Sequence, residues 1–192
     1  MLSVDFSPNE FINEIDNLLI RGVKDHKHPF HQFALSTYGS EQINQRMVVL
    51  RRWVLNRRTL MFHTDKRSPK IKDLKKNSHC SILFYSRPQN LQLRFKCISH
   101  IHQGDALADV LFNEASESQL EYYKYKASPS SKISKNSLKA YKEKKVDAKE
   151  NFVVCVCNFF ELELLYLNRE QHIRILYEWD KHSQMTSSYL IP

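Results

Sequence analysis

The feature that most constrains the fold is a series of short apolar runs, rich in β-branched and aromatic residues, separated by polar turns. Five of them follow one another at 30–37, 46–55, 59–64, 79–85 and 91–102. Three more close the chain at 151–158, 159–167 and 172–179. Runs of this length and composition are typical of β-strands. We therefore expect a mainly β protein built as an antiparallel barrel, because closure removes exposed strand edges.

Helical patterns flank these runs. The first begins with Ser7, Pro8 and Glu10, a capping box with proline at the first helical position. Its apolar residues share one helical face: Phe11, Ile12, Ile15, Leu18 and Leu19. Gly22 suits the end of this helix. We expect the helix to cover the sheet.

Two more helices are expected between the strands. In the shorter one Ser68 can cap, Pro69 takes the first position and Asn77 ends the helix. The longer one spans 105–125, where helical spacing includes the following apolar positions: Ala106, Val110, Ala115 and Leu120. The whole pattern predicts a β-barrel with peripheral α-helices.

Chain length favours one domain. With 192 residues, 42% of them hydrophobic, the chain can bury one core, and we expect a single domain over 1–192. No apolar run approaches the roughly 18 to 20 residues that a membrane helix needs. The N-terminus also lacks the basic and apolar regions of a signal peptide. The sequence thus predicts a soluble protein with no membrane partner.

Cysteine placement points to a reducing compartment. Cys80, Cys97, Cys155 and Cys157 each lie in or near an apolar run, where a free thiol packs as a small hydrophobe. Cys155 and Cys157 are two residues apart, which is not the C-x-x-C spacing of redox or zinc sites. We expect free thiols, no metal site and a cytoplasmic location.

Positive charge narrows the class of ligand. The 29 Lys and Arg against 21 Asp and Glu give a net charge of +8, which favours phosphorylated ligands or nucleic acid. Much of the excess lies in a Lys-rich segment, 132–149, which we interpret as solvated and mobile. No aromatic side chains alternate with its lysines, so a stacking platform for single-stranded nucleic acid is disfavoured.

Four spaced pieces of the sequence carry cations and hydrogen-bond donors. They are 46–51, 62–64, 68–70 and Gln92. Adjacent strands would bring such pieces together, which indicates one anionic ligand rather than a long polymer. Alternate side chains of a strand face opposite sides, so Arg46 and Arg51 have different roles.

In order and spacing, these pieces resemble the FMN-binding split-barrel family of pyridoxamine 5'-phosphate oxidases, over about 30–177. The family pattern reads approximately R-M-V-L-L-K, F-Y-T, S-R-K and R-Q-V. The resemblance implies an FMN-binding split β-barrel, with FMN held by Arg46, Met47, Val48, Val49, His63, Thr64, Arg67, Lys70 and Gln92. Pro69 stands where the family has arginine, and Arg67 could compensate from two residues earlier.

The same resemblance implies a homodimer. Ser130 and Ser131 follow the helical region as the family's Q-S-S does, with Pro129 in place of glutamine. His172 and Arg174 resemble the family's H-x-R, whose arginine reaches the flavin and whose histidine lies close to the substrate. Both pieces would come from the second subunit, so that each FMN is shared between two chains.

Substrate residues depart from the family pattern. Arg51 replaces a substrate-proximal lysine, and Ser118 keeps the family serine. Val110 and Glu114 stand at the positions of a tyrosine and an arginine, and Glu170 replaces a second arginine. Carboxylates at these positions would repel a phosphate where the family attracts one. Oxidation of vitamin B6 phosphates is therefore not the preferred activity.

Our leading hypothesis is an FMN-dependent oxidoreductase with an altered substrate pocket, in which N5 of the flavin accepts a hydride from a small molecule. Arg51, Ser118 and His172 are expected nearest the substrate. Three alternatives stay open: a genuine pyridoxamine or pyridoxine 5'-phosphate oxidase in which Arg51 and Lys126 or Lys124 compensate for the missing cations, a non-catalytic flavin-binding module, and a basic barrel for nucleic acid. The histidines His26, His28 and His31 are interpreted as a polar loop rather than haem ligands.

Overall fold

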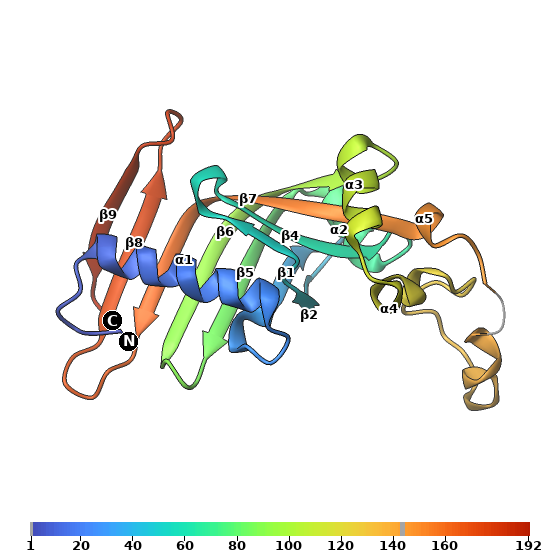
Figure 1. Ribbon diagram of the computed structural model, residues 1–192, viewed down its shortest axis with the longest axis horizontal. Coiled ribbons are helices and arrows are strands. Elements are labelled where there is room, and N and C mark those ends of the chain that lie inside the picture. The colour runs from blue at the N-terminus through green and yellow to red at the C-terminus, as the bar shows by residue number, and fades with distance from the viewer. Residues whose placement is uncertain (1, 143–144) are drawn as a thin grey trace.

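The computed structural model describes residues 2–142 and 145–192, and its described strands form one antiparallel sheet (Figure 1). The strands are β1 Gln32–Tyr38, β2 Ile43–Val49, β3 Arg52–Val54, β4 Thr59–Asp65, β5 His79–Ser86, β6 Leu91–His102, β7 Phe152–Tyr166, β8 Ile173–Trp179 and β9 Met185–Leu190. The helices are α1 Pro8–Lys24, α2 Pro69–Lys76, α3 Ala106–Glu114, α4 Glu117–Leu120 and α5 Ala148–Asn151. Short 3-10 turns are η1 Pro29–His31, η2 Leu55–Arg57, η3 Glu121–Tyr123, η4 Lys135–Leu138 and η5 Ala140–Lys142. This confirms the mainly β architecture with peripheral helices.

The sheet curls into a split barrel. Its strand order is β2-β1-β5-β6-β7-β4-β3, and β8 and β9 extend it beyond β7. The two ends of that path, β2 and β3, are joined by Leu50 and Arg51 alone. The N–H of Leu50 donates to His31 beside β1, and the N–H of Arg51 donates to Met61 in β4, both at 2.8 Å. The chain therefore crosses from one side of the split to the other at these two residues, which is why the run expected at 46–55 is two strands.

An aromatic core fills the barrel. Trp53 stacks on Phe159 with ring centroids 5.3 Å apart, and Phe95 packs edge-on against both rings. Phe33, Phe62 and Phe84 continue the cluster on the other side and are fully buried. Burying each such ring stabilises the fold by about 1.5–3 kcal/mol.

Helix α1 covers one face of the sheet, as expected (Figure 1). The capping box of Ser7 and Glu10 is present, and the predicted apolar face is buried. Trp53 donates to Asp16 at 2.7 Å, and the Tyr177 hydroxyl donates to the Pro8 carbonyl at 2.7 Å. The predicted end at Gly22 is wrong, because the helix continues to Lys24. A Cβ at Gly22 would meet the Phe30 carbonyl oxygen at 2.5 Å, so glycine serves close packing there.

Strand β7 is the central strand of the molecule and is buried on both faces. Cys155 and Cys157 point into the barrel core, while Val154 and Val156 pack under α3. The two strands expected at 151–158 and 159–167 are therefore one continuous strand of 15 residues. The ladder with β6 shifts register between Lys96 and Cys97, which leaves Phe160 as the extra residue.

Two other predicted elements differ from the structure. The helix expected over 105–125 ends at Glu114, and Ser116 caps a new helix through a capping box with Gln119. In α3 the buried residues are Ala108 and Leu111, whereas Val110, which was expected on the apolar face, is 51% exposed. Strand β9 was not expected, because its sequence is polar and shows no apolar alternation. In the structure it pairs only with β8, and nearly all of its residues are exposed.

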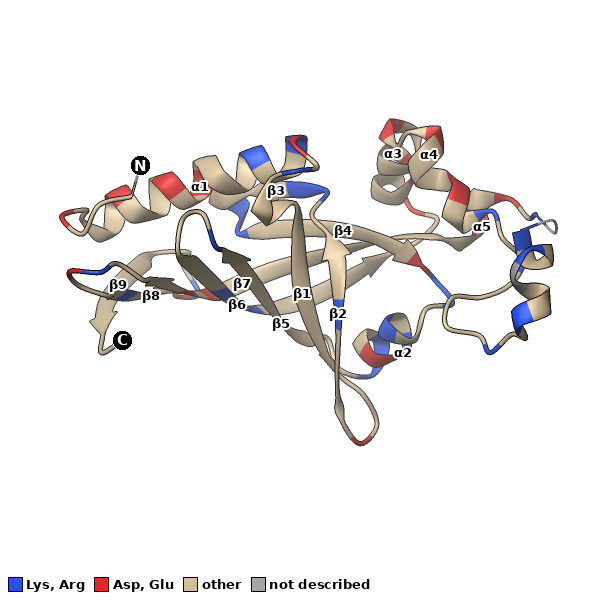
Figure 2. Cartoon of the chain, turned by 90° about the horizontal axis from the view of Figure 1, so that it is seen from below, with Lys and Arg blue, Asp and Glu red and all other residues tan. Residues whose placement is uncertain are grey.

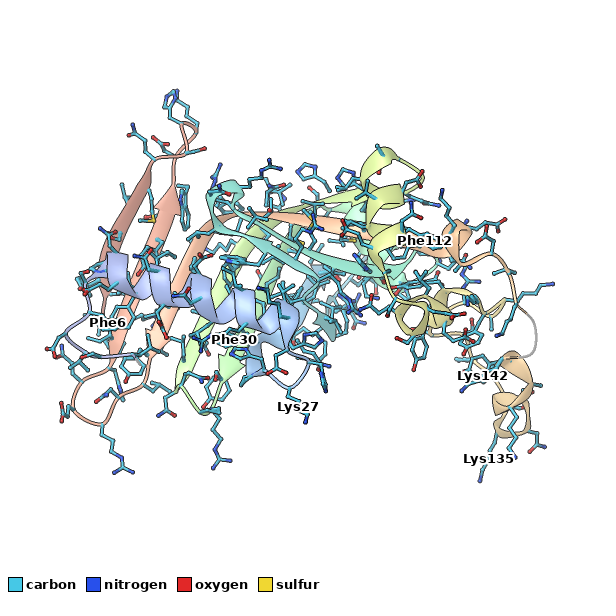
Figure 3. The ribbon with its side chains drawn as sticks, viewed as in Figure 1. Phe6, Lys27, Phe30, Phe112, Lys135 and Lys142 are labelled. Atoms are coloured by element: carbon cyan, nitrogen blue, oxygen red, sulfur yellow. The ribbon has the colours of Figure 1, made fainter. Side chains whose placement is uncertain are left out.

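All four cysteines are free and buried, as expected. None of the helices in the described ranges is long and apolar enough to cross a membrane. The described part of the Lys-rich segment forms η4, η5 and α5, and Figure 3 shows Lys135 and Lys142 projecting at the end of the molecule far from Phe6 and Phe30. Positions 143 and 144 lie outside the described residues, and mobility of the segment stays a prediction.

Candidate functional site

A hollow of about 450 Å³ opens at the split between β2 and β4. We call it the split hollow, and its lining residues are Met47, Val48, Val49, Arg51, His63, Thr64, Asp65, Ser68, Lys70, Ser118, Gln119, Tyr122, Tyr123 and Pro129. Strands β2 and β4 supply two walls, the start of α2 a third, and α4 with η3 the fourth. Small-molecule sites typically have volumes of about 300–1,000 Å³, so this hollow is of a suitable size.

Lys70 supplies a cation at the α2 end of the split hollow. Its Nζ donates to Ser68 Oγ at 2.6 Å and to Thr64 Oγ1 at 3.0 Å. Within the described ranges no carboxylate lies within 4.0 Å of this ammonium. Burial, together with the nearby Arg46, lowers the pKa of Lys70. Ser68 does not cap α2 with its side chain, contrary to expectation, because its hydroxyl accepts from Lys70.

Arg51 supplies the second cation of the hollow. The residue lies at the crossing between β2 and β3 and is half-buried. Burial lowers the pKa of its guanidinium, which nevertheless stays charged at neutral pH. Among the described residues no carboxylate lies within ion-pairing distance of it. A half-buried cation that has no carboxylate beside it is unfavourable unless an anion binds to it. Arg51 and Lys70 therefore both indicate an anionic ligand.

His63 lies beside Arg51 in an uncharged state. Burial, and then the positive charges of Arg51 and Arg52, lower the pKa of His63 to about 4. The ring packs edge-on against Phe152 with centroids 4.8 Å apart. Its Nε2 atom is buried and has no hydrogen-bond partner in the part of the chain that the structure describes. A neutral imidazole with one free nitrogen is thus available to a ligand.

The wall made by α4 and η3 contributes residues that the sequence did not single out. Burial raises the pKa of Tyr123 to about 12, so its phenol is neutral. The Tyr123 carbonyl accepts from Asn151 at 2.9 Å, which ties η3 to α5. Gln119 and Tyr122 line the same wall. The closely spaced tyrosines at 122, 123 and 125 were the available signal, but an unbroken helix at 105–125 would have spread them around its axis.

Two predicted phosphate ligands lie outside the hollow. Arg46 donates to Thr37 at 2.6 Å and lies 3.5 Å from Asp73. The guanidinium of Arg67 is occupied by Asp65, at 2.6 and 2.9 Å, and by the carbonyls of Tyr125 and Lys126. Arg67 therefore clamps the 125–126 backbone to the end of β4. Replacing those contacts by a phosphate would require breaking them.

Gln92 and Arg174 lie on the outer face of the sheet, away from the split hollow. Gln92, Leu165 and Arg174 form one row across β6, β7 and β8. Arg174 is held by Glu163 Oε1 at 2.8 and 3.1 Å, and Arg94 donates to the same oxygen. Gln92 lines a second hollow of about 380 Å³ together with Arg94 and Glu163. Within one chain Arg46 and Lys70 are neighbours, but Gln92 does not join them.

The strand register gives the distance between the split hollow and the Glu163 region of the outer face. A row of directly paired residues runs Met47, Ala34, Leu83, Arg94, Glu163. Four strand steps place the lip of the split hollow roughly 19 Å along the sheet from Glu163. One small ligand cannot contact both ends of this row in a single chain.

The outer face carries exposed apolar side chains beside the charged residues Arg94, Glu163 and Arg174. Figure 2 shows α1 on one side of the sheet and the opposite side of β5, β6 and β8 bare in that view. Large exposed apolar side chains on this side are Tyr38, Ile43, Met47, Leu83, Tyr85 and Phe160. Several large apolar side chains exposed on one face are consistent with a surface that another chain covers.

The remaining predicted site residues are exposed. Ser130 lies in a turn with a φ of 66°, directly after Pro129, which lines the split hollow of the same chain. This segment therefore needs no second chain to reach the hollow. His172 precedes β8 and is exposed. Glu114 lies 2.6 Å from Arg52, and Glu170 is exposed in the β7–β8 loop.

The lining residues suit FMN. Half-buried Lys70, with the buried hydroxyls of Ser68 and Thr64, forms a cationic set that has no ion-paired carboxylate among the described residues, which fits a phosphate group. Met47, Val48 and Val49 give the hollow an apolar strand wall whose backbone faces the split, which fits the edge of a planar ring. Charge, shape and size of the hollow therefore agree with this cofactor.

Comparison with known proteins gives the family. Residues 12–103 match the family model of the pyridoxamine 5'-phosphate oxidase FMN-binding domain. Comparison with curated protein sequences returned no significant match.

Solved structures share the fold over nearly the whole chain. A pyridoxamine 5'-phosphate oxidase-related, FMN-binding protein from Nostoc punctiforme is 18% identical with a TM-score of 0.81, covering 98% of this chain and 100% of its own. PhzG from Burkholderia lata, solved with tetrahydrophenazine-1-carboxylic acid, is 18% identical with a TM-score of 0.75, covering 100% and 98%. A protein related to general stress protein 26 from Clostridium acetobutylicum is 12% identical with a TM-score of 0.56, covering 88% and 95%.

The matched model is that of an FMN-binding domain, and it includes both β2 and the start of α2, which line the split hollow. FMN is accordingly the cofactor of this chain. Residues 12–103 therefore belong to the pyridoxamine 5'-phosphate oxidase FMN-binding domain family, and the chain as a whole shares the fold of the solved neighbours.

Proposed function

We propose that this protein is a homodimeric FMN-dependent oxidoreductase acting on a small molecule. The observation that carries the proposal is the pair of cations, Arg51 and Lys70, that line one hollow and have no carboxylate within ion-pairing distance in the described ranges. Bound FMN supplies a two-electron acceptor for such chemistry. The protein's own residues bind, orient and shield the reactants.

Each part of the split hollow has a distinct role in this proposal. Lys70, Ser68 and Thr64 bind the FMN phosphate through charge-assisted hydrogen bonds. Met47, Val48 and Val49 lie along the flavin. Arg51, His63 and Ser118 lie at the open remainder of the hollow and face the substrate.

A second copy of the chain completes the site. Gln92 and Arg174 lie three and five strand steps from Met47, roughly 14 and 24 Å along the sheet, and the same outer face carries exposed apolar side chains. A two-fold axis through that face would place the Met47 end of the row in one chain against the Glu163 end of the row in the second chain. Arg174 and Gln92 would then reach the FMN bound mainly by the other chain. His172, just before β8, would accompany Arg174 towards the substrate.

Vitamin B6 phosphates are the less favoured substrates. The carboxylate of Glu114 is held by Arg52, so it repels a phosphate less than the sequence suggested, but Arg52 is equally removed from binding one. Lys124, considered as a compensating cation, lies 3.6 Å from Glu117 and 3.5 Å from Glu121. Of the cations that line the hollow among the described residues, Lys70 is assigned to FMN, which leaves Arg51 for the substrate.

Free thiols support a reducing compartment for this function. Cys80 and Cys157 have their sulfurs 4.0 Å apart and remain unbonded, and all four cysteines are buried. Buried thiols of this kind are usual in the cytoplasm, which we propose as the location.

Comparing FMN with riboflavin tests the proposal. The purified protein should bind FMN with a flavin absorption spectrum, and Lys70→Gln should weaken FMN binding by about 10-fold to 100-fold, the loss of one charge-assisted hydrogen bond. Riboflavin, which lacks the phosphate, should bind both proteins equally well. Fluorescence titration measures both ligands.

Lys75→Gln is the matched control, because Lys75 is exposed in the last turn of α2. It should bind FMN like the unaltered protein. Failure of the unaltered protein to take up FMN, or equal loss of FMN and riboflavin in Lys70→Gln, would refute the assigned phosphate site.

A further inference from the structure

We propose that the protein binds single-stranded nucleic acid at a second site, where one base enters a hollow lined by tyrosines and the neighbouring phosphates lie on exposed lysines. The hollow has a volume of about 260 Å³ and adjoins the split hollow. We call it the tyrosine hollow, and its lining residues are Tyr122, Tyr125, Ala127, Ser128, Pro129, Ser131, Ile133 and Tyr141. The proposed subunit interface lies on β5, β6 and β8, and none of these strands lines the tyrosine hollow.

Folding gathers tyrosines that are spread along the sequence. Tyr125 packs edge-on against Tyr122, with ring centroids 6.4 Å apart, and against Tyr141, with ring centroids 5.4 Å apart. Tyr125 is buried, whereas Tyr122 is 72% exposed, so much of the Tyr122 ring is accessible to a ligand. The hollow is slightly smaller than the roughly 300–1,000 Å³ of sites for drug-sized molecules, so it suits one flat ring. Every nucleobase has a flat face that stacks on an aromatic side chain.

Backbone contacts fix the base of this site. The Arg67 guanidinium donates to the carbonyl of Tyr125 at 3.0 Å and to that of Lys126 at 2.8 Å. The N–H of Val146 donates to the Lys124 carbonyl at 2.7 Å. These hydrogen bonds hold the place from which residues 127–142 project at the end of the molecule (Figure 3).

Positive charge surrounds the tyrosine hollow. No aspartate or glutamate occurs at positions 122–142. Figure 2 shows the lysines of this stretch in blue at the end of the molecule next to α5. The neighbouring carboxylates of Glu117 and Glu121 lie within 3.6 Å of Lys124, and Glu121 also pairs with Lys145. Five other lysines are exposed and have no carboxylate within 4.0 Å in the described part of the chain: Lys126, Lys132, Lys135, Lys139 and Lys142.

Ring and charge together favour single-stranded nucleic acid over other anionic partners. The Lys142 ammonium lies 6.0 Å from the centre of the Tyr141 ring, so both kinds of group meet at one place. An acidic peptide would pair with the lysines but leave the tyrosine hollow without a flat ring. A single strand offers unstacked bases with a phosphate beside each of them. The sequence disfavoured such a platform because no aromatic residue alternates with the lysines, but Tyr122 and Tyr125 join them from outside the Lys-rich segment.

Two oligomers of equal charge test the stacking of a base. They are an oligothymidylate of about 12 nucleotides and its abasic counterpart, each titrated into FMN-loaded protein and measured by fluorescence anisotropy. We expect the oligothymidylate to bind at least about 5-fold more tightly, the effect of one stacked base. Tyr122→Ala should remove this difference. Tyr122→Phe keeps the aromatic ring and should retain it.

Salt dependence tests the lysines. Each phosphate contact of a single strand adds about 0.7 to the slope of log affinity against log salt concentration. Lys135→Gln/Lys139→Gln should therefore lower that slope by about 1.4. Lys27→Gln/Lys181→Gln is the matched control, because both lysines are exposed and lie outside the tyrosine hollow. It should leave the slope unchanged, as should Tyr122→Ala, which removes no charge.

Equal affinity for the two oligomers in the unaltered protein would overturn the inference, because the lysines alone would then bind any polyanion. An equal change of slope in the two double variants would overturn it as well, since net charge and not this site would bind the strand. Absence of measurable binding would do the same. Uptake of FMN is measured before the titrations, and its failure would count against the proposed function while the same titrations still decide this site.

Discussion

Single residues in the split hollow show how burial sets charge. His63 and Arg51 are both removed from bulk water, yet the histidine is neutral and the arginine charged. The ordinary pKa values of the two side chains differ by about six units. The cost of burying a charge therefore removes the proton from the histidine at neutral pH but not from the arginine. Beside a cation, a neutral imidazole is also the only form that avoids repulsion.

This state of His63 predicts a pH-dependent stability. Its native pKa of about 4 lies below the ordinary 6.5, so as pH falls the unfolded chain takes up a proton before the native one does. Above pH 6.5, His63 makes the free energy of unfolding no more pH-dependent. Below pH 6.5, its protonation in the unfolded chain lowers the free energy of unfolding until about pH 4. Between pH 7 and pH 5 the unaltered protein should lose about 2 kcal/mol more than His63→Gln, measured by urea unfolding. Parallel losses in the two proteins would show that His63 is solvated.

Which residues lie together could be predicted where the motif itself lines the hollow. Met47, Val49, Thr64 and Lys70 were named from the sequence and line one hollow. Arg46 was also named, but its partner Asp73 comes from α2, and a sequence pattern does not show which carboxylate folding will bring to an arginine.

At the scale of elements, Gly22 illustrates a contact that sequence patterns hide. Glycine near a helix end normally indicates termination, and α1 instead continues for two residues past it. The reason is the close approach of η1, whose backbone lies against the Gly22 Cα.

Gly22→Ala is therefore expected to destabilise the protein despite the better helix propensity of alanine. A Cβ there would lie 2.5 Å from the Phe30 carbonyl oxygen and 2.7 Å from its carbon, and this backbone cannot turn aside as a side chain could. We expect a loss of about 1–3 kcal/mol in the free energy of unfolding. Asn13→Ala, at an exposed position of the same helix, should stay within about 0.5 kcal/mol. Equal stability of the two variants would mean that η1 moves aside.

The strands were predictable where one face is buried and the other exposed. Strand β6 has the expected bounds, Leu91–His102, because its residues alternate between core and surface. Strand β7 is buried on both faces along its first half, so its apolar run contains no alternation to mark a boundary. Strand β9 is exposed on both faces and has no apolar pattern at all.

At the scale of the whole molecule, the sheet separates two sets of family site residues. Lys70 belongs to the split hollow, and Arg174 belongs to the outer face beyond Glu163. A single chain places only the first set at the split hollow. Two copies related by a two-fold axis through the outer face would form two equivalent sites, each with Lys70 from one chain and Arg174 from the other.

This arrangement predicts complementation between two defective variants. Lys70→Gln and Arg174→Gln should each bind FMN weakly as homodimers. After subunit exchange, about half of the dimers should be mixed, and each mixed dimer has one site with both residues intact and one with neither. About a quarter of all sites should therefore recover tight FMN binding, measured by titration of flavin fluorescence. Exchange between two differently tagged copies of Lys70→Gln is the control and should recover none. If the mixed preparation gains no tight sites although exchange is complete, Lys70 and Arg174 do not meet across a subunit interface, and the outer face has another partner.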